Sequence, residues 1–432
     1  MDFANTQDKR STILSVLIFL TGFTTGLFQS YMGIGAVGMA AFFMTVYFVI
    51  VCISQRKITL RLRNRLFSNI LLISVVLMIM GLMISTIISS SEWAIRIFPI
   101  AIQYFFSFYI AYLFIASLNK RELDLLLTSY IVGGFVLAFL SIIIYLYAYD
   151  FGIQNLLIWR NGRLQMFSGA NGLAPHMVLL SILLIYRISV KQLSGLYYLL
   201  LVIPFYVITL TGSNSGVILY IVAVFGLLAF IRGLKLKLIL VMMAACGYLF
   251  LLNITHISET YDIPVLKRFD WINSGSVEEA GTYHERSEAI RVVWLYVMNN
   301  PIIGVGAGAA GADGVFTTEV STGLSSQPHN VYVLLWAEGG IIAIVGLLGW
   351  LFAILFASLS VSGKQRMFIL VTACTLALAI SMRAHSYQLW LTLPIYLLIG
   401  MIFHERQAWQ KQQISKMNNR QYLERFYMAN QK

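Results

Sequence analysis

The amino-acid sequence predicts an all-α fold: a polytopic transmembrane helical bundle of about twelve spans, built as a single integral membrane domain. Hydrophobic residues make up 59% of the 432 residues, and only 11% of the residues are charged. The mean hydropathy of +0.79 belongs to no soluble globular domain of this length. Apolar stretches of about 17 residues or more recur along the whole chain, and each is long enough to cross a hydrocarbon core of ~30 Å.

The hydropathy pattern gives the spans in order. The first apolar run begins at Ile13 and has no A-x-A-like cleavage site, so we expect it to be retained as a span. All three cysteines fall inside apolar runs, where a thiol behaves as a small hydrophobe, and no disulfide is expected. The predicted spans lie near residues 12–29, 32–53, 67–88, 98–118, 125–148, 173–186, 196–211, 214–231, 238–254, 330–357, 367–382 and 388–403.

The basic residues predict the orientation. With a cytoplasmic N-terminus, 22 of the 30 lysines and arginines fall in inside segments, as the positive-inside rule requires. We therefore expect an inner-membrane protein with both termini in the cytoplasm. The net charge of +12 then reflects topology and attraction to anionic lipid, and nucleic-acid binding is not indicated. The basic tail, 404–432, fits either a helix on the membrane surface or a disordered anchor.

Two outside segments, 149–172 and 255–329, contain most of the polar residues and are predicted to be periplasmic. In the longer one, the stretch T-Y-H-E-R-S-E-A-I-R-V-V-W has helical spacing, and the helix is expected to end near Pro301. The glycine-rich run 304–314 fits either a flexible loop or a loop that approaches a ligand closely. It resembles no Walker or dinucleotide fingerprint.

Arginines on the translocated side oppose the orientation signal, and seven of them are predicted there, five within the two polar segments. A bound anion explains them, because the planar guanidinium fork suits phosphate oxygens. Two or three arginines would let a diphosphate leaving group depart without a metal. The alternative is that they form solvated ion pairs with carboxylates of the same loops, such as Glu285, Glu288 and Asp150.

The run P-H-N-V-Y-V-L-L-W-A-E-G-G holds a histidine where a polar segment meets a long span. His329 has the chemistry to accept a proton from a sugar hydroxyl, and Asn330 beside it to orient a polar substrate. Alternatively, this histidine only satisfies backbone groups at the start of a helix. Glu338, about two turns further on, is a functional candidate or an arginine's partner, because an ionisable group at that depth is costly alone. His385 is the rival base.

No group of His, Cys, Asp or Glu in the sequence has metal-ligand spacing, and D-x-D, G-x-S-x-G and Walker motifs are absent. We therefore expect no metal and no cofactor.

Four stretches, in order, resemble the O-antigen ligase/polymerase family of membrane glycosyltransferases. They cover about residues 160–345. The stretches are R-L-Q-M-F-S-G-A-N-G-L-A from Arg163 through Asn171; L-T-G-S-N-S-G from Leu210 to Gly216; Arg286 followed by Pro301 and I-I-G-V-G; and His329 and Asn330 followed by A-E-G-G from Ala337.

The resemblance implies a GT-C-like helical bundle with one large periplasmic loop and inverting transfer from an undecaprenyl-diphosphate donor. It implies that His329 acts on the acceptor hydroxyl and that Arg163 and Arg286 lie near the diphosphate, with Arg291 as the alternative to Arg286. The remaining predicted phosphate-binding or substrate-binding residues are Arg160, Asn171, Ser213, Asn330 and Glu338.

Three positions depart from the family pattern. Asn214 stands where arginine is frequent, Ala170 where proline is common, and Ala343 where ligases carry Gly, Thr or Tyr. These departures favour a polymerase of lipid-linked polysaccharide repeat units, with a chain-length regulator and a flippase as expected partners. The alternatives are a ligase that transfers the glycan to lipid A-core and, outside the enzymes, a flippase for the same lipid-linked sugars.

Overall fold

The structure is a computed structural model of the chain. It describes residues 2–27, 33–55, 65–89, 94–147, 150, 152, 158–159, 163–164, 170–230, 283–309, 329–361, 363–382 and 391–407. Within several of these ranges the first or last side chains are not described.

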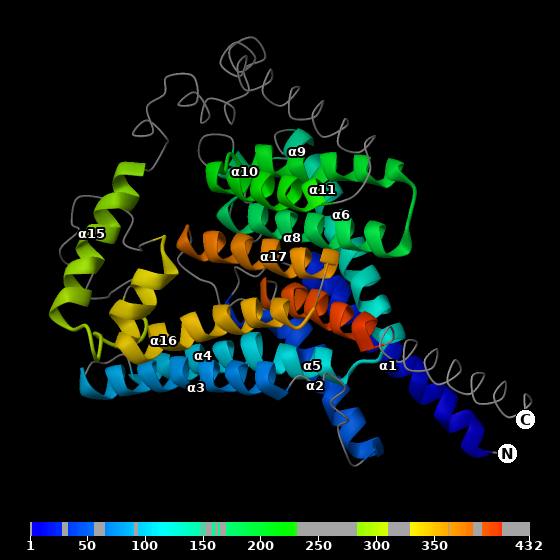
Figure 1. The fold of residues 1–432 in the computed structure, drawn as a ribbon, viewed down its shortest axis with the longest axis horizontal. Helices are drawn as coiled ribbons and strands as arrows, with labels where there is room; N and C mark the ends of the chain where they lie inside the picture. Colours follow the sequence, from blue (N-terminus) through cyan, green and yellow to red (C-terminus); the bar gives the residue numbers. More distant parts are fainter. Residues whose placement is uncertain are drawn as a thin grey trace, which may run out of the picture.

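Helices make up nearly all of the described chain (Figure 1). The first half contains α1 (Asp2–Leu27), α2 (Gly33–Gln55), α3 (Arg65–Ile88), α4 (Ala94–Tyr104), the π-helical η1 (Phe105–Ile110), α5 (Ala111–Ser117), α6 (Lys120–Tyr147) and α8 (Ala170–Lys191). The second half contains η4 (Gly195–Leu201), α9 (Val202–Leu210), α10 (Asn214–Tyr220), η5 (Ile221–Phe225), α11 (Gly226–Phe230), α15 (Tyr283–Asn299), α16 (Val331–Leu359), α17 (Gly363–Ser381) and a last helix over 391–407.

Every predicted span but one coincides with a helix or a continuous helical segment; the exception, 238–254, lies outside the described residues. Among the described helices, six are long and apolar enough to cross a membrane by length and composition. The all-α membrane class is therefore confirmed, and the number of twelve spans stays a prediction. One small element was not predicted: strands β1 (Ile158–Trp159) and β2 (Arg163–Leu164) pair antiparallel between α6 and α8.

Small residues let α3 and α16 pack at close range, and in Figure 1 these two helices run side by side. A Cβ atom added at Gly81 would lie 2.5 Å from Ala343 N and 2.7 Å from Gly339 O, so no larger residue fits. A Cβ atom added at Gly346 would likewise lie 2.6 Å from Ser74 O. Because lipid is as apolar as leucine, close backbone contact of this kind is a main source of helix association in membranes.

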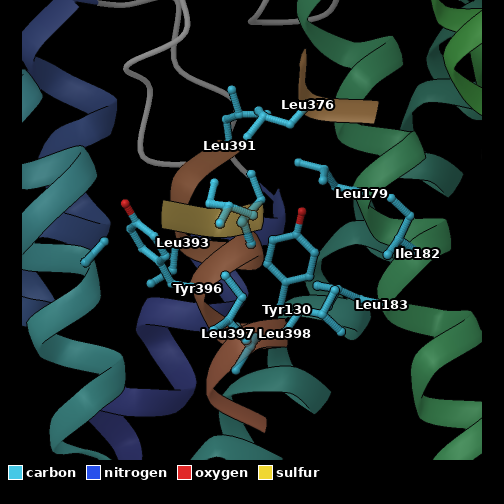
Figure 2. Packing of buried hydrophobic residues seen from close by; sticks show 14 of the residues in the cluster. Tyr130, Leu179, Ile182, Leu183, Leu376, Leu391, Leu393, Tyr396, Leu397 and Leu398 are labelled. Carbon is cyan, nitrogen blue, oxygen red and sulfur yellow. The ribbon is translucent and has the colours of Figure 1, made fainter. Parts of the chain in front are cut away.

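Buried side chains from distant spans form the core, part of which is shown in Figure 2 around Tyr130 and Tyr396. The His176 ring is fully buried, with Nε2 2.8 Å from Gly26 O and Nδ1 3.3 Å from the Tyr130 hydroxyl. Since a carbonyl only accepts, Nε2 carries the proton and the Tyr130 hydroxyl donates to Nδ1. His176 therefore links α8 to α1 and α6.

Several polar residues of the predicted inside segments are paired at one end of the bundle. At the start of α6, Asp124 pairs with Arg187 at 2.8 Å and with Lys191 at 3.3 Å, both at the end of α8. There too, Gln365 donates to Glu405, whose pKa is raised above its ordinary value, chiefly by burial. The start of α1 lies toward this end and α15 lies at the opposite end (Figure 1). Which end faces the cytoplasm stays a prediction.

Candidate functional site

The polar junctions opposite the Asp124 end of the bundle carry the candidate site, and the first of them is built on Arg163. This residue sits in β2, paired with Trp159 of β1, and its side chain is only 6% exposed. Its Nε donates a hydrogen bond of 2.8 Å to Thr211 O, at the end of α9. The first two family-like stretches are therefore in contact, although 48 residues separate the bonded pair. Arg163 is therefore a buried residue, not a solvated one.

The turn that receives Arg163 explains the stretch L-T-G-S-N-S-G. Gly212 has φ +56°, a left-handed conformation that glycine adopts without strain, and it ends α9. Ser213 is the N-cap of α10, and its hydroxyl accepts a hydrogen bond of 3.2 Å from Gly216 N. This serine, predicted to bind substrate, thus has an observed structural role at the helix start.

The histidine predicted to be the base lies at the start of α16. His329 is half-buried and directly precedes Asn330, the N-cap, whose Oδ1 accepts a hydrogen bond of 3.2 Å from Val333 N. Asn330 therefore has a structural role at the start of this helix. One turn on, the Tyr332 hydroxyl donates to Ala377 O at 3.2 Å and fixes this end of α16 against α17.

A break in α16 follows, which the sequence analysis did not predict. Gly340 has φ 67° and ψ −166°, so the stretch that starts after Asn330 bends away from the rest of the helix. The bend exposes backbone groups, and the glycine-rich loop after α15 bonds them. Val305 N donates to Ala337 O at 2.8 Å, and Gly306 N donates to Glu338 O at 3.0 Å.

The third bond of this junction runs the other way, from Ile341 N to Ile302 O at 3.1 Å. Gly304, with φ +82°, allows the approach, because a Cβ there would lie 2.7 Å from Gly340 N. The described part of the glycine-rich run, 304–309, is therefore neither a flexible loop nor one shown to approach a ligand. It packs closely on the broken helix of its own chain.

Two hydroxyls near the end of α3 hold the same loop, and no sequence motif marks them. Gly306 N also donates to Ser85 Oγ at 2.7 Å, and Ala307 N donates to Thr86 Oγ1 at 2.9 Å. Both side chains are buried. A serine and a threonine within an apolar span look like ordinary packing residues, and their partners lie 221 residues away.

Helix α15 is attached to the first part of α16 and confirms the predicted helix before Pro301. Val293 and Val297 form a small apolar cluster with residues of the loop and of α16. Trp336 Nε1 donates to Pro301 O at 2.9 Å, and the rings of Trp336 and Trp294 meet edge to face with centroids 5.6 Å apart. The helix that carries the two candidate arginines is thereby held against the part of α16 that follows His329.

The other predicted site residues fall as follows. Arg291 is exposed on α15, and Glu338 is buried in the first part of α16. Arg286 and Asn171 lie in the first turns of α15 and α8, but their side chains are outside the described residues. Arg160 and the rival base His385 are outside them altogether.

No three His, Cys, Asp or Glu side chains that the structure describes are grouped so as to hold a metal ion. The expectation of metal-independent chemistry stays a prediction.

These elements define an all-helical, multi-pass membrane protein. Residues 199–348 match the family model for the O-antigen ligase. The matched segment contains the Thr211–Gly216 turn, α15, the glycine-rich loop and the start of α16 with His329. It confirms the resemblance to the O-antigen ligase/polymerase family of membrane proteins. No curated protein matches the chain.

Proposed function

We propose that this protein polymerises lipid-linked polysaccharide repeat units, such as those of O-antigen, capsule or exopolysaccharide, on the periplasmic face of a bacterial inner membrane. The family match supports an O-antigen ligase/polymerase-like function and a lipid-linked glycan as the substrate. The three departures at Ala170, Asn214 and Ala343 favour the polymerase over the ligase. In this proposal both termini lie in the cytoplasm, and a flippase and a chain-length regulator work alongside the enzyme.

In the proposed reaction, the glycan on undecaprenyl diphosphate is attacked at its anomeric carbon. A hydroxyl of another lipid-linked repeat forms the new C–O bond and gives its proton to the His329 imidazole. The anomeric C–O bond to the diphosphate breaks, and its electron pair leaves with the diphosphate. Arg163 and Arg286, or Arg291 in place of Arg286, stabilise the leaving charge, and attack from the opposite face inverts the anomeric centre.

The buried contact between Arg163 and Thr211 carries this proposal furthest. Burying a guanidinium away from water is costly, and the group is retained where it has hydrogen-bond acceptors or anions to meet. Its Nε is used on Thr211 O, which fixes the plane of the fork at the turn before α10. A guanidinium whose plane is already fixed loses little side-chain entropy when a phosphate binds it.

The break in α16 raises the alternative of a flippase, because transporters place substrate and ion sites at broken helices. In such sites the freed backbone groups point at the cargo. Here Ala337 O, Glu338 O and Ile341 N are bonded to the loop at 302–306. The broken helix is therefore closed by the protein itself, which favours a positioning role for the break in an enzyme.

The experiment that separates the candidates uses the purified protein in lipid nanodiscs. Undecaprenyl-diphosphate-linked repeat is supplied alone, then with added lipid A-core, and the products are resolved by size. The proposal predicts a ladder of longer lipid-linked glycans from the repeat alone. A product that forms only with lipid A-core would show a ligase. No glycosyl transfer in either case, with transfer of the lipid across proteoliposomes, would show a flippase.

A further inference from the structure

The outward surface of α15 is apolar, although the helix belongs to a segment predicted to face the periplasm. Val293 and Val297 are buried against α16. Trp294, whose ring meets Trp336, is still 41% exposed, and on the other side of the helix Leu295 is 50% and Met298 63% exposed. If this side of the helix met water, three large apolar side chains would be exposed within little more than one turn. An apolar patch of this kind is typical of a surface that contacts lipid or another protein.

This apolar face continues into the surface that the spans turn outward. Ile302, three residues after α15, is 68% exposed, and its carbonyl accepts the hydrogen bond from Ile341 N. Ile341 begins an exposed stripe on α16 that continues with Val345 and Leu348, spaced by four and three residues. A stripe of this kind on a membrane-spanning helix faces lipid, so the α15 face is continuous with the lipid-facing surface of the bundle.

The direction of α15 agrees with this placement. In Figure 1 the long helices α3, α16 and α17 run parallel to one another, whereas α15 lies across them at the end where α3 finishes. Ser85 and Thr86, near the end of α3, bond the loop after α15. Exposed isoleucines follow on α3 at positions 87 and 88. The helix therefore lies at the level where a span leaves the membrane.

One cation shares the apolar face. Arg291 is exposed on α15, one turn before Leu295 and three residues before Trp294, so the three side chains project from the same side. Tryptophan is enriched at the boundary between lipid and water, and arginine extends its charged end from an apolar surface toward the headgroups.

We propose that α15 is an interfacial helix: Trp294, Leu295, Met298 and Ile302 lie in the outer leaflet at the headgroup–acyl boundary, and Arg291 lies at the level of the lipid phosphates. The occupant of this surface is the lipid bilayer itself. This inference rests on the proposed function only in its consequence for the substrate. At that depth, Arg291 would contact the diphosphate of a lipid-linked substrate that diffuses within the outer leaflet. It would not contact a sugar phosphate dissolved in water.

The test measures depth with spin labels on the full-length chain. Cys52, Cys246 and Cys374 are replaced by serine, and single labels are placed by Leu295→Cys and Met298→Cys. Two matched controls are Val345→Cys, on the outward face of α16, and Lys364→Cys, exposed at the start of α17. Each protein is reconstituted in nanodiscs of phosphatidylethanolamine and phosphatidylglycerol without substrate. Collision of the label with oxygen, which partitions into lipid, is compared with collision with a water-soluble nickel complex.

The inference predicts an oxygen-to-nickel ratio at positions 295 and 298 several-fold above that at 364 and approaching that at 345. A ratio equal to that at 364 would show that the apolar face of α15 meets water, where a protein partner could cover it. Labels shielded from both reagents would mean that the chain itself covers the face. Either result overturns the inference. Because no substrate is present, failure here is distinct from failure of the polymerase assay.

Discussion

The junction at Gly340 sets the position of His329, and Gly340→Ala is expected to disrupt it. The backbone there has φ 67° and ψ −166°, a combination almost confined to glycine, and a side chain costs about 1–3 kcal/mol in it. The added Cβ would also collide with the carbonyl of Ile302. Relieving the collision separates the loop from α16 and breaks three backbone hydrogen bonds, each worth about 1 kcal/mol. The expected loss of stability is therefore about 4 kcal/mol or more.

The matched control is Gly363→Ala. Gly363 also has a positive φ, +59°, but nothing lies within 4 Å of an added Cβ, so only the conformational cost of about 1–2 kcal/mol remains. Unfolding is followed by titration with sodium dodecyl sulfate in mixed micelles, and amide exchange of Val305, Gly306 and Ile341 reports on the junction itself. If the two variants were equally stable and these three amides stayed equally protected, the described junction would not hold α16.

Two further predictions concern the groups that hold the site together. Replacing both hydroxyls, by Ser85→Ala with Thr86→Val, removes the Thr86 acceptor of the buried Ala307 amide, at about 1–3 kcal/mol, while Gly306 N keeps its bond to Glu338 O. The amide of Ala307 should then exchange markedly faster, whereas Thr45→Val, which removes a hydroxyl bonded within its own helix, should leave it unchanged. Arg163→Lys loses the Nε bond to Thr211 and the planar fork, so polymerisation should slow by about tenfold or more. Arg187→Lys, which alters an ion pair at the other end of the bundle, should act normally; equal rates for the two variants would remove Arg163 from the site.

The sequence predicted those features that depend on local composition. Apolar length predicted the helices, and helical spacing predicted α15 before Pro301, because these signals are carried by neighbouring residues. The resemblance found the Thr211–Gly216 turn and His329 but not how they are held.

The remaining features depend on contacts between distant segments. Ser85 bonds a loop 221 residues later, and nothing in its own span marks it. Gly340 was visible as one of two adjacent glycines after Glu338, but its positive φ exists only because Ile302 and Gly304 approach it. The burial of Arg163 likewise requires α9 to end beside β2. Tertiary contacts, which no local pattern encodes, decide all three.

The most direct test of the account is the rate at which His329→Ala lengthens undecaprenyl-diphosphate-linked repeats in nanodiscs. A positioned general base contributes roughly 10²–10⁴-fold, so the account predicts a loss of at least about a hundredfold with unchanged stability. His404→Ala, at the opposite end of the bundle, should keep the native rate. A His329→Ala protein that lengthened the repeats as fast as the native one would contradict the assignment of this imidazole as the base.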